Sequence, residues 1–187
     1  MAVLTSPQLE QLTGDYVIDS AHSRIGFVAR HAMVTKVRGS FNEFEGSVHL
    51  DVDDPSRSWA RVTIQAKSID TGNSQRDEHL RSNDFLAMDE YPDITFVSTS
   101  AERIDETRFA LTGNLTLRGV TKPVTIEFEY LGAVLDPWGK QRIGFEGSTT
   151  INRKDWGVNW NMALEAGGVL VSEKVTLEFE IAAVKVD

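Results

Sequence analysis

Apolar and polar residues alternate with a period of two along most of the chain. The alternation is clearest in the segments 24–31, 43–52, 60–67, 94–98, 109–117, 124–130, 143–151 and 175–181. Successive side chains of a strand point to opposite faces, so each segment predicts a strand with one apolar face. About eight such strands at regular spacing predict an all-β sandwich or barrel.

One segment interrupts this alternation and has the features of a short helix. It follows a turn cluster in which the possible capping residues are Thr71, Asn73 and Ser74. The spacing of Asp77 and Arg81 favours an ion pair along a helix. Pro92 prevents any continuation of the helix.

The predicted helix has too few apolar residues to be a core helix. Between Asn73 and Asp84 only Leu80 is strongly apolar. We interpret the segment as a polar-backed plug or lid whose inward residues are Leu80, Phe85, Leu86 and Met88. The alternative is a surface crossover that takes no part in binding.

The sequence pattern separates a sandwich from a barrel only weakly. A closed barrel of about eight antiparallel strands has an interior that can hold one small ligand. Gly46, Gly113 and Gly147 fall on the apolar faces. They would relieve crowding inside a barrel or permit sharp coiling, and they could equally mark bulges.

Composition places the chain among globular proteins and narrows the classes of partner. Its 187 residues carry a formal net charge of −9 and include no cysteine. The acidic balance argues against nucleic acid or an anionic membrane as partner. The first residues show no secretory signal, and no run approaches the roughly 20 apolar residues of a membrane span. We therefore expect a cytoplasmic protein with no stable membrane insertion.

Candidate chemistry is sparse. The four histidines, His22, His31, His49 and His79, form no HxH or HxxxH pair, so we predict no metal site. His31 is either bonded to backbone or, like His79, placed at a cavity mouth where it would bond a ligand head group. The sequence contains no nucleophile elbow, P-loop or dinucleotide fingerprint, and we predict no catalytic residue. We interpret Arg81 as a solvated charge.

The segment around Trp156 and Trp160 also departs from strict alternation, and it ends in glycines. It predicts a loop over one mouth of a barrel, where indole rings present apolar surface and N–H donors. The alternative is that both tryptophans plug the end of the barrel as part of the core.

Four segments in order carry a family resemblance: IDSAHSRIGFVARHAMVTKVRGSFNEFEG, RDEHLRSNDFLAMDEYPDITF, LTGNLTLRGVTKPVTIEF and INRKDWGV. Together they resemble the YceI-like family of lipocalin-like, polyisoprenoid-binding proteins. The resemblance implies an extended eight-stranded antiparallel barrel with one short helical crossover, spanning residues 14–187 after an N-terminal arm at 1–13. It also implies an elongated apolar cavity, and it makes a homodimer plausible. Many members carry a secretion signal, and this chain departs from them there.

We therefore expect a protein that binds, stores or transports an isoprenoid, a quinone or a fatty-acid-like lipid, with no other cofactor. The expected cavity and mouth residues are Phe27, Ala29, His31, Phe44, His79, Phe85, Phe96, Leu117, Phe145, Trp156 and Trp160. Two alternatives remain, an enzyme acting on a lipid-like substrate in the same cavity and a structural or stress-response domain whose interior is solid. Two polar groups within hydrogen-bond reach inside the cavity would favour the enzyme.

Overall fold

The computed structural model describes residues 11–165 and 167–186. The strands are β1 (Gly14–Ile18), β2 (Arg24–His31), β3 (Thr35–Phe41), β4 (Phe44–Leu50), β5 (Trp59–Gln65), β6 (Ile69–Asp70), β7 (Asp93–Arg103), β8 (Arg108–Leu117), β9 (Val120–Leu135), β10 (Gln141–Asn152) and β11 (Lys174–Lys185). Within residues 11–165 and 167–186 the one α-helix is α2 (Ser74–Arg81), which joins β6 to β7. Short 3₁₀ turns are η1 (Ser20–His22), η2 (Pro55–Arg57), η3 (Ala66–Ser68) and η4 (Arg153–Trp156).

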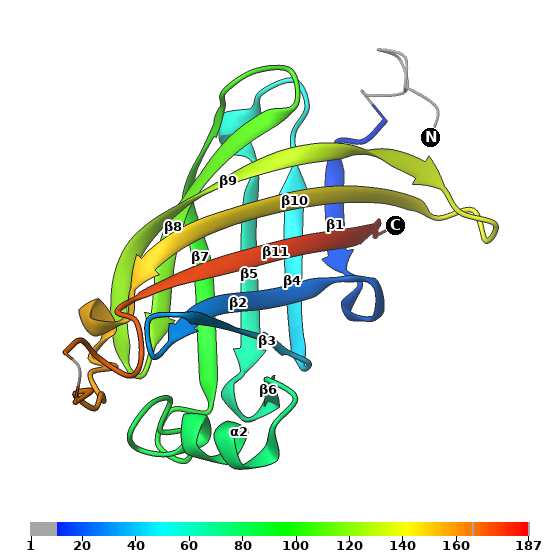
Figure 1. The fold of residues 1–187 in the computed structure, drawn as a ribbon. Helices are drawn as coiled ribbons and strands as arrows, with labels where there is room; N and C mark the ends of the chain where they lie inside the picture. Colours follow the sequence, from blue (N-terminus) through cyan, green and yellow to red (C-terminus); the bar gives the residue numbers. More distant parts are fainter. Residues whose placement is uncertain (1–10, 166, 187) are drawn as a thin grey trace.

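The strand segments form one closed antiparallel barrel (Figure 1). β1 and β2 pair with successive parts of β11, and they also pair with β4 and β3, respectively. β3 with β4, and β5 with β6, likewise act as single interrupted strands. The sheet therefore consists of eight long strands in up-and-down order, closed where β11 meets β1 and β2. The predicted eight-stranded antiparallel barrel is confirmed.

Two bulges change which residues of a strand face inward. In β7 the register shifts between Ser98 and Ser100, and in β9 it shifts at Leu131, opposite the Gly144–Phe145 step of β10. An extra residue in one strand moves every later side chain to the other face. Alternation read along a single strand therefore fails beyond these points.

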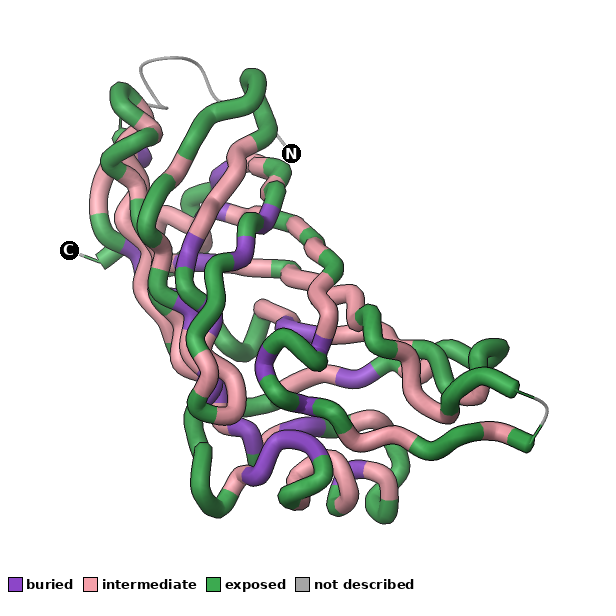
Figure 2. Tube along the Cα trace, turned by 90° about the vertical axis from the view of Figure 1, so that its left-hand side faces the viewer, coloured by how far each residue is buried: buried purple, intermediate pink, exposed green. Residues whose placement is uncertain are grey.

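Two clusters of buried side chains occupy the barrel. The larger includes Ile64, Phe96, Ile126 and Trp156, and the smaller is formed by Leu12, Tyr16, Ala133, Ile143 and Ala183. The longest run of buried residues among those described is Phe85–Ala87, beside the helix, at the lower end of Figure 2. Each end of the barrel thus has its own packed cluster.

The helix begins where the turn cluster predicted it. Asn73 is the capping residue, and its side chain accepts a hydrogen bond from the Arg76 amide. The expected ion pair between Asp77 and Arg81 does not form. Asp77 is buried and accepts hydrogen bonds from the amide and hydroxyl of Thr71 instead.

Arg81 is not a solvated charge, which corrects the sequence interpretation. Its guanidinium donates to the carbonyl oxygens of Lys67 and Ile69, at 2.8 and 3.1 Å. Backbone carbonyls left by the η3 turn need donors, and Arg81 supplies them. The helix is thereby fastened to the end of the barrel.

Most of the expected N-terminal arm, residues 1–10, lies outside the described residues. Leu12 follows it and is 1% exposed within the smaller core cluster. Its carbonyl accepts a 2.6 Å hydrogen bond from the Tyr16 hydroxyl. Across the described parts of the chain, no helix has the length and apolarity that crossing a bilayer requires.

Candidate ligand-binding cavity

An apolar cavity of about 290 Å³ runs through the barrel between the two core clusters. Every long strand contributes to its wall. β11 alone supplies four successive inward residues, Val175, Leu177, Phe179 and Ile181. The wall surface is almost entirely carbon. Such a hollow favours a hydrocarbon over water, because a water molecule inside would find few hydrogen-bond partners.

Partial exposure of inward side chains shows that this space is not filled by the protein itself. Leu177, Phe179 and Ile181 point into the barrel, yet each is only half-buried. Ala183, the next inward residue of the same strand, is 0% exposed where it enters the smaller cluster. The surface that these residues leave uncovered therefore faces the cavity. The alternative of a solid interior is wrong.

Two of the inward glycines make room for aromatic rings that border the hollow. A β-carbon at Gly113 would lie 2.5 Å from the ring of Phe96, and one at Gly147 would lie 2.6 Å from the ring of Phe128. Phe96 and Phe128 both line the cavity. The predicted relief of crowding is the role that these two glycines play.

The helical crossover closes one end of the cavity. Leu80, Phe85 and Leu86 line it, and Met88 packs against the larger cluster. Arg118, from the β8–β9 turn, donates a 2.7 Å hydrogen bond to the Phe85 carbonyl and holds that loop in place. The interpretation of this segment as a plug agrees with its position, and the surface-crossover alternative does not.

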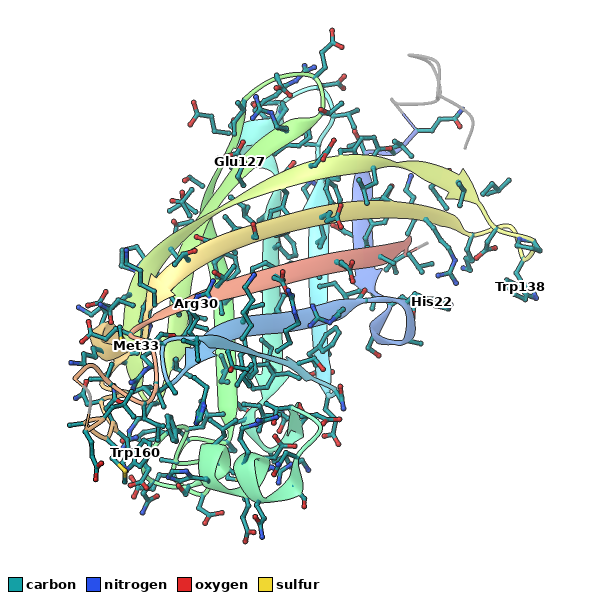
Figure 3. All side chains as sticks on the ribbon, in the orientation of Figure 1. His22, Arg30, Met33, Glu127, Trp138 and Trp160 are labelled. Carbon is teal, nitrogen blue, oxygen red and sulfur yellow. The ribbon has the colours of Figure 1, made fainter. Side chains whose placement is uncertain are left out.

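A ring cluster stands outside the plug. His79 meets the edges of Phe85 and Trp160 at centroid distances of 5.1 and 4.7 Å, and its Nε2 lies 2.8 Å from an Asp84 carboxylate oxygen. Trp160 is visible near the same end in Figure 3. His79 and Trp160 therefore back the cavity wall through Phe85 and do not line the cavity.

Arg153 fastens residues 157–165 and 167–173 over the neighbouring mouth. It is 4% exposed, and its guanidinium donates to the carbonyls of Ser172, Val158 and Val171 at 2.8, 2.7 and 3.2 Å. Burial away from water lowers the pKa of Arg153. The charged guanidinium donates its hydrogen bonds to backbone carbonyls, and these bonds hold Val158 and Val171 in the cavity wall.

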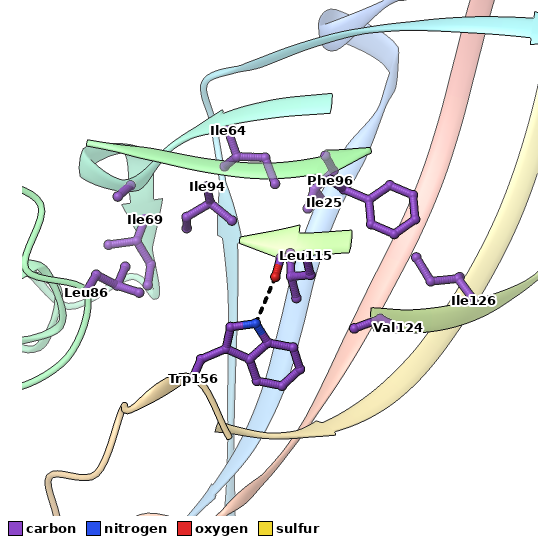
Figure 4. Packing of buried hydrophobic residues seen from close by; sticks show 11 residues of the cluster. Ile25, Ile64, Ile69, Leu86, Ile94, Phe96, Leu115, Val124, Ile126 and Trp156 are labelled. Atoms are coloured by element: carbon purple, nitrogen blue, oxygen red, sulfur yellow. Dashed lines mark hydrogen bonds between the residues drawn. The ribbon is translucent and has the colours of Figure 1, made fainter. Parts of the chain in front are cut away.

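Trp156 is part of the core, which decides between the two sequence interpretations for this residue. It is 3% exposed, and its Nε1 donates a 2.9 Å hydrogen bond to the Leu115 carbonyl (Figure 4). Asn152 caps the η4 turn that carries it, and Gly157 ends that turn in the left-handed region at φ 78°. Residues 152–157 thus form a capped turn that places the Trp156 ring in the core of the barrel.

The opposite end of the cavity is bordered by His49, Ser58 and Trp59. His49 Nδ1 lies 2.7 Å from an Asp15 carboxylate oxygen, and its ring stacks on Trp59 at 6.0 Å. Deeper in this end, burial raises the pKa of Tyr16 to about 12, with a further contribution from Tyr130. The Tyr130 hydroxyl is buried and finds no hydrogen-bond partner among the described residues.

Six of the residues expected at the cavity do border it: Phe27, Ala29, Phe85, Phe96, Leu117 and Phe145. Phe44 packs against the larger cluster. His31 is exposed, because β2 has left the barrel wall where it turns into β3, and its backbone bridges to Val171. The cavity lining does not include Trp156, which belongs to the core, or His79 and Trp160, which contact the outer side of Phe85.

Sequence reasoning missed other wall residues, among them Ile18, Phe41 and Ala101. Ile18 and Phe41 do follow alternation within β1 and β3, so a strand assignment there would have found them. Ala101 lies beyond the β7 bulge, where a simple period of two assigns it to the wrong face. No local sequence signal identifies that bulge.

Ionisable groups at the cavity wall are few and already bonded. Among the described residues only His49 and Arg153 line it with titratable side chains, and they lie towards opposite ends. His49 is bonded to Asp15, and Arg153 to backbone carbonyls. The described residues also contain no group of three or more His, Cys, Asp or Glu side chains arranged to hold a metal ion.

Comparison with known proteins identifies the fold and the family. A family model described as YceI-like domain matches residues 16–183. A UPF0312 protein of Pseudomonas paraeruginosa is 43% identical over 155 residues, which cover 82% of this chain and 81% of that protein. Among solved structures, a Campylobacter jejuni YCEI protein has a TM-score of 0.74 at 29% identity, covering 84% of this chain and 90% of that chain.

A third similarity concerns the ligand of another protein. The polyisoprenoid binding domain from Saccharophagus degradans, implicated in plant cell wall breakdown, has a TM-score of 0.66 at 16% identity. It covers 91% of this chain and 98% of that chain. At that identity the likeness shows the fold alone. None of these three similar proteins is described by a reaction.

Proposed function

Because the chain belongs to the YceI-like family, we propose that it binds one long apolar chain of the isoprenoid type inside its barrel and carries it through water, in storage or transport. The family consists of binding proteins rather than enzymes, and the polyisoprenoid binding domain of Saccharophagus degradans shares the fold. The proposal extends binding of this kind to the cavity bordered by Phe27, Phe128 and Leu177.

The single observation that carries the proposal is the half-buried state of the inward side chains. Apolar surface left uncovered inside a barrel is unfavourable in water and becomes favourable when a hydrocarbon covers it. Each buried methylene contributes roughly 0.8 kcal/mol. Affinity should therefore rise with chain length until the hollow is full.

Selectivity for a head group should be weak. The cavity wall offers no unpaired charge among the described residues, since His49 and Arg153 are engaged elsewhere. An alcohol, a quinone ring or another neutral head group would meet similar surroundings. The length and width of the apolar chain should decide which ligands bind.

Calorimetric titration of the purified protein with geraniol, farnesol and geranylgeraniol tests this proposal. We expect affinity to increase along the series and then to level off once the added isoprene units extend beyond the hollow. Absence of binding at every chain length would refute the proposal.

Neighbouring residues of β11 provide a matched pair of variants for the same titration. Leu177→Gln places an amide in the cavity wall, whereas Thr176→Gln places it on the outer face of the same strand. We expect at least a tenfold loss of affinity in the first and none in the second. Thermal melting of both variants verifies that they are folded, and equal affinities would place the ligand outside the hollow.

A further inference from the structure

The turn between β2 and β3 has an unusual backbone for its sequence. Ala32 and Met33 both have positive φ, 51° and 67°, and the Val34 amide donates to the His31 carbonyl at 3.2 Å. This is the pattern of a type I′ turn, which strongly favours Asn-Gly because residues with side chains are strained there. The chain instead places apolar side chains in a strained turn. Strained positions of this kind concentrate at functional sites.

The same turn is unusually apolar for a surface feature. Met33 is 60% exposed and Val34 is 77% exposed. The Ala32 amide donates to the Leu170 carbonyl at 2.7 Å, which joins the turn to the loop that covers the mouth of the cavity. On that loop, Met162 and Val169 are also exposed. We call Met33, Val34, Met162 and Val169 the apolar tip.

A row of cations lies directly behind the apolar tip. Arg30 and Lys36 are paired across β2 and β3, and both are exposed on the outer face. Lys174, at the start of β11, shares this face, because Val175 next to it points into the cavity. Like charges placed opposite one another destabilise a sheet. Arg30, Lys36 and Lys174 form no ion pair with any described residue.

The nearest carboxylates on these strands are neutralised. Glu178 lies 3.5 Å from Arg24 and 3.9 Å from Arg38, and Glu173 lies 2.8 Å from Lys154. The covering loop carries Glu165, so the positive character belongs to the strands and not to the loop. In a chain with net charge −9, this cation row is a local exception on the outer face of β2, β3 and β11.

We propose that the apolar tip and the cation row dock the protein on an anionic phospholipid surface. The apolar side chains would enter the interfacial layer while Arg30, Lys36 and Lys174 meet the lipid phosphates. Repulsion of the acidic remainder of the protein would favour orientations in which the cation row faces the membrane. Ala29 and Val171 line the cavity within a few residues of the tip, so docking would set the mouth against the bilayer. That consequence rests on the proposed lipid-binding function, whereas the docking itself does not.

An exposed tryptophan at the other end of the barrel provides a rival surface. Trp138, in the β9–β10 turn, is 81% exposed, and Figure 3 shows it far from Met33. Its neighbour Asp136 is bonded to Arg142, and among the described residues of this turn there is no row of unpaired cations like Arg30, Lys36 and Lys174. Trp138 therefore serves as an internal control.

Vesicle co-sedimentation of the full chain tests the proposal, with phosphatidylcholine vesicles compared to vesicles that also contain phosphatidylglycerol. We expect binding only to the anionic vesicles, and weakening by salt. Ala32→Asn/Met33→Gly/Val34→Ser supplies the residues that a type I′ turn favours, so it should fold at least as stably and yet lose binding. Trp138→Ser should bind like the unaltered protein.

A second pair of variants isolates the charges. Arg30→Gln/Lys36→Gln should weaken binding to anionic vesicles roughly tenfold or more, since each cation near such a surface contributes appreciably. Arg57→Gln/Arg103→Gln changes net charge equally near η2 and the β7–β8 turn, and it should have no effect. Absence of vesicle binding, or binding that follows Trp138 or net charge alone, would overturn the proposal.

Prenol titration of the same variants separates this proposal from the proposed function. The tip and charge variants should retain the affinity for farnesol that the unaltered protein has in vesicle-free solution. Farnesol binding without vesicle binding would refute docking alone. Vesicle binding without farnesol binding would refute the lipid cavity alone.

Discussion

Phe128 and Gly147 face each other across β9 and β10, and the phenylalanine ring occupies the space that a side chain at position 147 would need. The ring lies at the cavity wall, so the absence of a β-carbon on one strand sets the width of the hollow. This pair links a single residue type in the sequence to the capacity of the site.

Gly147→Ala should push the Phe128 ring into the hollow and also press on the Glu127 carbonyl, because a β-carbon there would lie 2.6 Å from the ring and 2.7 Å from that oxygen. Overpacking of this kind destabilises a protein by about 1–3 kcal/mol, and here it should also weaken binding of the longer prenols. Gly144→Ala is the matched control, because a β-carbon there meets its nearest neighbour at an ordinary 3.8 Å. Equal effects of the two substitutions on melting and on farnesol affinity would show that the ring does not define the hollow.

Arg153→Met should release the loop that covers the mouth. Removal of the guanidinium leaves the carbonyls of Val158, Val171 and Ser172 without this donor, and we expect a loss of about 2–4 kcal/mol in unfolding free energy. Lys154→Met removes only an exposed ion pair with Glu173 and should change stability by less than about 1 kcal/mol. Denaturant unfolding of both variants measures the difference, and similar losses would contradict the role assigned to Arg153.

Removal of the side-chain hydroxyl should lower the free energy of unfolding at Tyr16 but not at Tyr130. Tyr16→Phe deprives the Leu12 carbonyl of a buried donor and should lower the unfolding free energy by about 1–2 kcal/mol. Tyr130→Phe removes a buried hydroxyl that has no described partner, so stability should stay the same or rise. Chemical denaturation decides between them, and a larger loss in Tyr130→Phe would show that its hydroxyl has a partner after all.

The raised pKa of the Tyr16 hydroxyl also predicts how folding stability changes at alkaline pH. Its pKa is raised to about 12 in the folded protein, above the ordinary value of 10.0, so the folded state retains this proton longer than the unfolded state. Its contribution to stability is complete below pH 10 and declines as the pH rises from about 10 to about 12. Tyr16→Phe should therefore show a flatter decline in melting temperature over that range than the unaltered protein.

Titration of Asp19 should account for part of the loss of folding stability at acidic pH. A hydrogen bond from Arg142, 2.7 Å away, holds the pKa of this carboxyl below its ordinary value, and His22 adds to the effect. The resulting stability is present above about pH 4 and is lost as the pH falls through the lowered folded pKa. Asp19→Asn should cost about 1 kcal/mol at neutral pH and nothing in strong acid.

Asp89→Asn is the control for the acid experiment, since Asp89 is exposed and has no described partner. It removes the same charge without touching Arg142. Melting curves recorded from neutral to acidic pH should diverge from the unaltered protein only for Asp19→Asn. A constant difference at every pH would assign the effect to something other than titration of Asp19.

Much of the barrel follows from alternation alone. The inward residues predicted on β11 all line the cavity, as do Ile94 and Phe96 of β7. A strand buried on one face must place every second side chain inside, so its pattern carries the information locally. The helix cap at Asn73 was likewise a local property of the sequence.

The remainder depends on contacts between distant segments. Trp156 bonds to Leu115, and Arg153 to Ser172, and neither partner is marked by spacing in the sequence. The β7 and β9 bulges reverse the inward faces without a local signal. His31 and Trp160 are predicted at the cavity but lie outside it. The point at which a strand or loop leaves the barrel wall is determined by the closed barrel and has no mark in the local sequence.

Native mass spectrometry of the protein as purified from cells tests the central claim most directly. If the half-buried inward side chains surround a binding site, the spectrum should contain protein carrying one lipid-sized adduct. Unfolding should release that adduct, and added geranylgeraniol should replace it one for one. Protein that shows only its bare mass, and stays bare after incubation with geranylgeraniol, would contradict the account.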